Sequence, residues 1–169
     1  MKIGVISDTH DQIQKIEQAV DIFNQEKVEL VIHCGDWVAP FSLIPFRKLT
    51  CPIKGIFGNN DGDRYRHIER SAEWKMNLKY EERFMSFTID NRKIAVFHGD
   101  YQELIDTLVM CSKYDAVFHG HTHIRVNETI GKTLSLNPGT LLIITAPGVE
   151  GASFAIYETT TNTARFIDL

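Results

Sequence analysis

The segment KIGVISDTHD, residues 2–11, decides the fold expected for the amino-terminal half of the chain. Lys2 to Ser7 form a short run rich in β-branched residues, which is typical of a buried strand. The run ends at once in the polar loop Asp8-Thr9-His10-Asp11. Apolar side chains then follow at the spacing of one helix face, with His10 or Asp11 expected as the cap: Ile13, Ile16, Val20 and Phe23. The segment therefore predicts a strand, a polar loop and a helix in that order.

Two further strands are predicted to end in the same way. Leu30 to Cys34 leads into Gly35-Asp36, and Ile53 to Phe57 leads into Gly58-Asn59-Asn60-Asp61. A short helix is expected between them, bounded by Pro40 and Pro45. In α/β proteins, ligands bind at the carboxyl ends of the strands. The three polar loops are therefore expected to lie together and to form a site.

The rest of the chain is predicted to contain two helices and several short strands. The helices are expected at residues 63–76 and 101–109, and a hairpin of residues 84–89 and 93–97 is expected to turn at Asp90-Asn91. A strand over residues 115–118 precedes Gly120. Short strands are then predicted at 126–130, 133–136, 141–145, 153–157 and 164–167, and we expect an antiparallel meander. The pattern favours two packed β-sheets with flanking helices, and residues 1–169 are interpreted as one domain.

The composition limits the classes of function. Of 169 residues, 43% are hydrophobic and 24% charged, as in ordinary globular proteins. The formal charge of −4 argues against a surface for long nucleic acid or for an anionic membrane. The three cysteines fit neither a zinc finger nor a disulfide framework, the amino terminus does not resemble a signal peptide, and no apolar run approaches the ~18 residues of a membrane span. We therefore expect a cytoplasmic protein, with homo-oligomerisation left open.

The polar residues at the predicted strand ends form a set suited to metal ions. His121 and His123 are two residues apart, so both rings point the same way in an extended backbone. The whole set holds two carboxylates, one amide and four imidazoles: Asp8, His10, Asp36, Asn59, His98, His121 and His123. Such donors suit Mn, Fe, Co, Ni or Zn better than Ca or Mg. We predict two adjacent divalent ions bridged by Asp36, with a hydroxide between them that attacks a phosphate ester.

Five motifs also carry a resemblance: Asp8-x-His10, Gly35-Asp36, Gly58-Asn59, His98-Gly99 and Gly120-His121-x-His123. With these motifs in this order, the chain resembles the calcineurin-like metallophosphoesterases. It is most similar to their small single-domain prokaryotic phosphodiesterase branch, which Asn137-Pro138-Gly139-Thr140 also resembles. The resemblance implies a four-layer α/β sandwich of two mixed β-sheets flanked by helices. It also implies manganese as a common activating ion, with one ion held by Asp8, His10, Asp36 and His123 and the other by Asp36, Asn59, His98 and His121.

We therefore expect a dinuclear metal-dependent phosphoesterase that hydrolyses phosphodiester bonds in a small substrate, with Asp36, Asn59 and Asn60 as catalytic residues. Many members of the family have a histidine after the ligand asparagine, where it protonates the leaving group. Here Asn60 stands at that position, and an amide cannot act as a general acid at neutral pH. Poor leaving groups should therefore react more slowly than activated aryl groups. A phosphomonoesterase, a cyclic-nucleotide phosphodiesterase and a non-catalytic metal-binding scaffold, like the phosphoesterase-like subunit of retromer, are the alternatives.

The remaining polar residues are assigned supporting roles. His33 and His119 are interpreted as structural, with hydrogen bonding to the ligand loops as a further role for His33. Thr9 and Asp61 are expected to orient ligands. The arginines of residues 64–70 are interpreted as a solvated helix face, and His67 is a hypothetical substitute for the missing acid.

Overall fold

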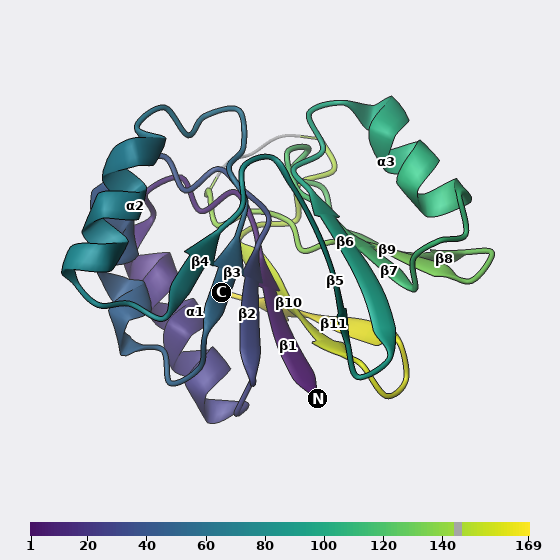
Figure 1. Ribbon diagram of the computed structural model, residues 1–169, viewed down its shortest axis with the longest axis horizontal. Coiled ribbons are helices and arrows are strands. Elements are labelled where there is room, and N and C mark those ends of the chain that lie inside the picture. The colour runs from purple at the N-terminus through teal and green to yellow at the C-terminus, as the bar shows by residue number, and fades with distance from the viewer. Residues whose placement is uncertain (144–146) are drawn as a thin grey trace.

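Two mixed β-sheets lie face to face in the computed structural model, which describes residues 1–143 and 147–169 (Figure 1). The first sheet has the order β11-β10-β1-β2-β3-β4. Its parallel strands are β1 (Lys2–Ile6), β2 (Leu30–His33), β3 (Ile53–Gly55) and β4 (Leu78–Tyr80), and β10 (Ser153–Glu158) and β11 (Thr163–Asp168) form an antiparallel hairpin beside β1. The second sheet has the order β5-β6-β7-β9-β8. It consists of β5 (Phe84–Ile89), β6 (Arg92–Phe97), β7 (Ala116–Phe118), β9 (Thr133–Asn137) and β8 (Val126–Ile130).

Helices cover the outer face of each sheet. Figure 1 shows α1 (Ile13–Gln25) and α2 (Arg64–Glu73) on the outer side of the first sheet and α3 (Gln102–Met110) on the outer side of the second. Phe23 of α1 packs on Phe154 of β10, with ring centroids 4.6 Å apart. A Cβ at Gly4 would lie 2.4 Å from the Phe23 ring, so the glycine lets α1 approach β1 closely. The result is the predicted order of four layers: helices, sheet, sheet, helix.

The apolar core divides along these layers. Alternate residues of β1 and β6, such as Ile3, Val5, Ile94 and Val96, are buried between the two sheets. The other face of each sheet packs against its own helices. Both sheets are therefore buried on two faces over much of their area, which explains why their central strands are almost continuously apolar.

Several predicted elements differ in the structure. The meander is wrong, because the β8–β9 hairpin joins the second sheet, with β9 parallel to β7, whereas β10–β11 joins the first. Residues 141–143 are not in a strand, and residues 144 and 145 of the same predicted strand lie outside the described residues. β4 was not predicted.

Two helical details also differ. Helix α1 has Gln12 at its amino-terminal cap without a side-chain hydrogen bond, and Asp11 instead accepts from Ala39 N at 2.9 Å. The predicted helix between the prolines consists of two 3₁₀ turns, η1 (Pro40–Leu43) and η2 (Pro45–Lys48). Pro45 has no N–H to continue the first turn into a longer helix.

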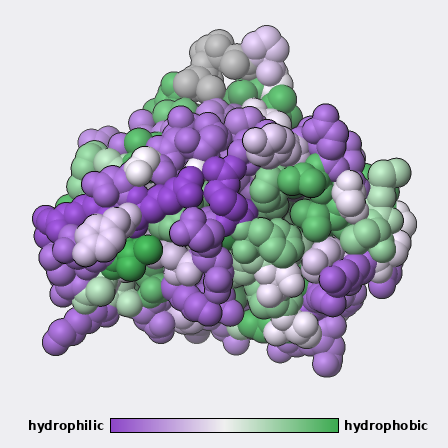
Figure 2. All heavy atoms as spheres, turned by 45° about the horizontal axis from the view of Figure 1, so that its top comes forward, coloured by the Kyte–Doolittle hydropathy of each residue, from purple (hydrophilic) through white to green (hydrophobic). Residues whose placement is uncertain are grey.

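The carboxyl ends of β1, β2, β3, β6 and β7 meet at one edge of the molecule, the upper edge in Figure 1. Figure 2 turns this edge towards the viewer and shows hydrophilic residues across the centre, with more hydrophobic residues on the right. In the parts of the chain that the structure describes, no helix has the length and apolar character needed to cross a membrane.

Candidate metal centre

Loops from both sheets bring the seven predicted ligands together at this edge. The first sheet supplies Asp8 and His10 after β1, Asp36 after β2 and Asn59 after β3. The second supplies His98 after β6, and His121 and His123 after β7. Each side chain contacts at least one of the others at 3.8 Å or less. The site therefore spans the boundary between the two sheets.

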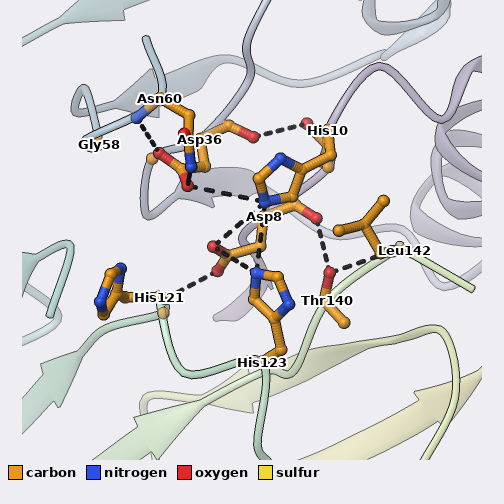
Figure 3. Close-up of polar contacts among 12 residues, drawn as sticks. Asp8, His10, Asp36, Gly58, Asn60, His121, His123, Thr140 and Leu142 are labelled. Carbon is orange, nitrogen blue, oxygen red and sulfur yellow. Dashed lines mark hydrogen bonds and ion pairs between the residues drawn. The ribbon is translucent and has the colours of Figure 1, made fainter. Parts of the chain in front are cut away.

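One group of donors centres on Asp8. Its Oδ1 lies 3.3 Å from His123 Nε2 and 3.8 Å from His10 Nε2. The two imidazole nitrogens are themselves 3.3 Å apart. Figure 3 shows these three side chains pointing towards one another. This is the spacing of donor atoms that can share one metal ion.

A second group centres on Asp36 and His98. His98 Nε2 lies 3.4 Å from Asp36 Oδ1 and 3.0 Å from Asn59 Oδ1, and the same amide oxygen is 2.9 Å from His121 Nδ1. Asp36 Oδ2 faces the first group, 3.6 Å from His10 Nε2. Asp36 thus lies between the two groups, and Asp8 is also close enough to His98 and Asp36 to share a cation with them.

A buried oxygen of Asp8 without a hydrogen-bond partner in the described part of the chain indicates that these residues fit a cation. Asp8 is fully buried, and its Oδ1 has no hydrogen-bond partner among the described residues. A buried carboxylate oxygen without a donor is unfavourable unless a cation satisfies it. The neighbouring backbone is kept free of side chains, because a Cβ at Gly58 would lie 2.1 Å from Asp36 Oδ1 and one at Gly120 would lie 2.4 Å from Asp8 Oδ2. The donor set and the space around it fit divalent metal ions.

The ligand loops have an unusual backbone. Five of the seven predicted ligands have positive φ angles: Asp8, His10, Asp36, His121 and His123, between 39° and 70°. Non-glycine residues rarely adopt this conformation, and each such residue is held there by surrounding contacts. The strain is concentrated where the side chains converge, as is common at functional sites.

The carboxylates and imidazoles of the site shift one another's pKa values. Burial alone would raise the pKa of Asp8, but the nearby imidazoles of His10 and His123, together with His98, outweigh it and hold that pKa well below its usual range. Burial would also raise the pKa of Asp36. The hydrogen bond and the charge of His98 outweigh burial, so the pKa of Asp36 is lowered. The pKa of His98 is raised, because its hydrogen bond to Asp36 and the charges of both carboxylates exceed the effect of burial. Both carboxylates are therefore ionised and available as ligands at neutral pH.

Asp61 holds two of the ligand loops. Its carboxylate accepts from the backbone N–H groups of Asp36 at 3.0 Å, Val38 at 2.8 Å and Gly58 at 2.7 Å. These bonds connect the loop after β2 to the loop after β3. They support the predicted role of Asp61 in orienting ligands.

His33 and Thr9 connect two further loops. Gly35 N donates to His33 Nδ1 at 3.1 Å, which leaves the ring proton on Nε2 to donate to Thr9 Oγ1 at 3.1 Å. Burial lowers the pKa of His33 far below its usual value, so the ring is neutral. It also stacks on Trp37, with centroids 3.5 Å apart. His33 is thus a supporting residue, as predicted, and Thr9 lies between it and the ligand loops.

Two supporting residues lie far from the ligands in the sequence. Asn137 Nδ2 donates to Gly120 O at 2.9 Å, and Thr140 Oγ1 donates to Asp8 O at 2.9 Å. Their segment was noted in the sequence only for its resemblance to the family. Arg83 was not predicted at all: it donates to Gly58 O at 3.3 Å and pairs with Asp100, and so connects the Asn59 loop to the His98 loop. No local sequence signal distinguishes Arg83 from an ordinary surface arginine.

The structure does not favour His67 as a substitute acid. The side chain is fully buried, with Nδ1 3.3 Å from Tyr80 Oη and Nε2 3.3 Å from Val38 O. Arg66 and Arg70 pair with Glu69 and Glu73 on the surface of α2, as expected for a solvated helix face.

The four-layer sandwich and its cluster of carboxylates and imidazoles define a class, the metal-dependent phosphoesterases. The family model of the calcineurin-like phosphoesterase superfamily domain matches residues 1–162. The chain therefore belongs to the calcineurin-like phosphoesterase superfamily, and it is a hydrolase that acts on phosphoric esters.

Individual relatives agree with this assignment. Phosphodiesterase MJ0936 of Methanocaldococcus jannaschii is 42% identical over 142 residues, which cover 82% of this chain and 83% of that protein. The solved structure of an archaeal phosphodiesterase has a TM-score of 0.90 at 37% identity and covers 100% of both chains. Vps29 of Entamoeba histolytica, solved in complex with zinc, shares the fold, with a TM-score of 0.70 at 19% identity over 99% of both chains.

Proposed function

We propose that this protein is a dinuclear metal-dependent phosphodiesterase. The observation that carries the proposal is the convergence of seven donor side chains in two adjacent groups, one around the buried Oδ1 of Asp8 and the other around Asp36 and His98. One ion would be held by Asp8, His10, Asp36 and His123, and the other by Asp36, Asn59, His98 and His121. We propose manganese, because imidazole, carboxylate and amide donors suit it.

Two bound divalent ions would supply an activated water as nucleophile and would neutralise charge on the phosphate. Asp36 holds the two halves of the site together through its contacts with His10 and His98. Asn59 Oδ1 lies beside both His98 Nε2 and His121 Nδ1, so the three donor atoms are close enough to bind one ion. Asn60 would contribute hydrogen bonds and no acidic proton.

The names of the relatives, and not the charges near the site, favour a diester over a monoester. Two arginines contact the loop that carries Asn59: Arg64 donates to Asp61 O at 3.1 Å and Arg83 to Gly58 O at 3.3 Å. Both are paired with carboxylates, Glu82 and Asp100 respectively. The second negative charge of a monoester would be offset by the two bound divalent ions, so these paired arginines do not select between a diester and a monoester. The names of the phosphodiesterase relatives agree with this substrate class.

A non-catalytic scaffold is the alternative. The fold is shared with Vps29, but this chain has a donor side chain at each of the seven predicted ligand positions. Intact ligands argue for catalysis.

We further propose a single domain over residues 1–169 and a location in the cytoplasm. The family match runs almost the whole length of the chain. Cys34, Cys51 and Cys111 are free, as expected in a reducing compartment.

The test is hydrolysis of bis(p-nitrophenyl) phosphate by chelator-treated protein, with and without added Mn²⁺, alongside the His121→Ala variant. We expect Mn²⁺ to restore turnover in the wild type and His121→Ala to lose most of it, because the variant removes one imidazole donor. Calorimetric titration with Mn²⁺ should give two sites in the wild type.

Two results would overturn the proposal. Metal binding without turnover, with Mn²⁺, Ni²⁺, Co²⁺ and Zn²⁺ each tried, would favour the scaffold. Turnover that survives exhaustive removal of metal would contradict a metal-dependent reaction.

A further inference from the structure

A cavity lies beside the loop that carries His121 and His123, and His119 and Thr122 line it. It has a volume of about 300 Å³, at the lower end of the range for small-molecule sites. One wall is a single face of α3, formed by Gln102, Ile105, Asp106, Val109 and Met110. The opposite wall is formed by alternate residues of the edge strand β8, namely Val126, Glu128 and Ile130. Figure 1 shows α3 on the same side of the molecule as β8 and β9.

The floor of the cavity is polar. His119 and Ser135 are each only 5% exposed, and both line the cavity. His119 Nε2 lies 3.0 Å from Ser135 Oγ, and no group among the described residues bonds to His119 Nδ1. An imidazole ring has two nitrogens, so with Nε2 engaged by Ser135 the other nitrogen is left to hydrogen-bond to a molecule in the cavity.

The charge of the cavity is negative. Asp106 on α3 and Glu128 on β8 face it from opposite walls, and no lysine or arginine lines it. An anionic phosphoester would be repelled there, so the cavity is not a subsite for the substrate proposed above. Apolar side chains form the rest of the walls and favour an apolar body in the ligand.

We propose that this cavity binds a small organic cation, an amine with an aromatic or aliphatic body. The apolar body would pack between α3 and β8, the ammonium group would lie near Asp106 and Glu128, and His119 would provide a hydrogen bond at the floor. The proposal does not depend on metal or on hydrolysis.

The test uses the full-length protein and two probes of similar size and opposite charge, phenethylamine and 3-phenylpropionate. Binding is followed by NMR at neutral pH, through backbone amides of α3 and β8 and the side-chain ¹⁵N resonances of His119. Phenethylamine should give saturable shifts at both places, and 3-phenylpropionate should give none. A shift of the His119 nitrogens would report contact with the floor.

The charge requirement is tested with Asp106→Asn and Glu128→Gln, which keep the side-chain shape. Each should weaken phenethylamine binding by roughly threefold, as expected for a partly exposed charge pair, and the double variant by about tenfold. Glu103→Gln is the matched control, because Glu103 lies on the same helix and does not line the cavity. The proposal is overturned if phenethylamine gives no saturable shift, if both probes bind equally, or if Glu103→Gln weakens binding as much as the two cavity variants.

Discussion

Asn60 contacts the carboxylate that lies between the two groups of ligands. Its side-chain amide donates to Asp36 Oδ2 at 2.6 Å and its backbone N–H donates to Asp36 Oδ1 at 2.9 Å (Figure 3). The residue therefore orients Asp36 but has no acidic proton to give to a leaving group. A leaving group at this site would have to depart as an anion.

We expect the reaction to depend steeply on the acidity of the leaving group. In a series of substituted-phenyl methyl phosphates, the logarithm of kcat/KM should fall sharply as the pKa of the phenol rises. The Asn60→His variant should flatten this plot by accelerating the poorest leaving groups, by up to about 10²-fold for general-acid catalysis. The p-nitrophenyl ester should change little.

Asn60→Ala is the control for this experiment, because it removes the amide without adding an acid. It should keep the steep plot of the wild type. If wild type and Asn60→His give parallel plots, leaving-group protonation does not limit this enzyme.

At the level of elements, helix α2 packs on the rest of the protein through a small, polar buried face. Half of its ten side chains are charged, Arg66 and Arg70 pair with Glu69 and Glu73 at the surface, and only His67 and Ser71 are buried. Asp63 caps the helix by accepting from Arg66 N at 3.1 Å. His67 contacts Val38 O and Tyr80 Oη, and so attaches α2 to the loop after β2 and to β4.

The stability of the metal-free protein should therefore depend on pH through His67. Burial lowers the pKa of His67 from its ordinary 6.5, so the folded protein resists a proton that the unfolded chain accepts. This contribution to stability is fully present above pH 6.5 and is lost as the pH falls towards the lower folded-state pKa. Urea unfolding between about pH 7 and pH 5 should show the free energy of unfolding decrease on acidification.

The His67→Phe variant isolates this contribution, because phenylalanine fills the space and cannot titrate. Its free energy of unfolding should fall less over the same pH range. Equal pH dependence in the two proteins would show that His67 is protonated equally in the folded and unfolded states.

At the level of the whole molecule, the site joins the two sheets. The first sheet carries Asp8, His10, Asp36 and Asn59, and the second carries His98, His121 and His123. Protein contacts across this boundary include Asn59 with His98, and Arg83, which precedes β5, with Gly58 O after β3. An ion bound by ligands from both sheets would bind the folded state alone, since the unfolded chain does not hold those ligands together.

Metal ions should consequently stabilise the fold. At a free Mn²⁺ concentration 100 times the dissociation constant, each site should add about 2.7 kcal/mol to the free energy of unfolding. Thermal unfolding with Mn²⁺ and with chelator measures this effect. His121→Ala should reduce it, and Ca²⁺, which prefers oxygen ligands, should give a smaller shift than Mn²⁺. A melting temperature that is the same with Mn²⁺ and with chelator would contradict metal binding across the two sheets.

The sequence by itself determined the local features of this protein. β1, β2, α1, the β5–β6 hairpin and α3 follow from the period of apolar residues, which is a property of neighbouring residues. The set of seven convergent polar residues was also readable, because each follows a strand directly and strand ends meet at one edge. The family followed from the same short motifs.

Only the tertiary structure decided which distant segments meet. A hairpin pattern does not specify the sheet that it joins, so the separation of β8–β9 from β10–β11 depended on the packing of both sheets. The bonds of Asp61, Arg83 and Thr140 to the ligand loops, and the cavity between α3 and β8, likewise arise between residues far apart in the chain. Periodicity encodes which face of an element is buried, but the partner of that face is selected by the packing of the whole molecule.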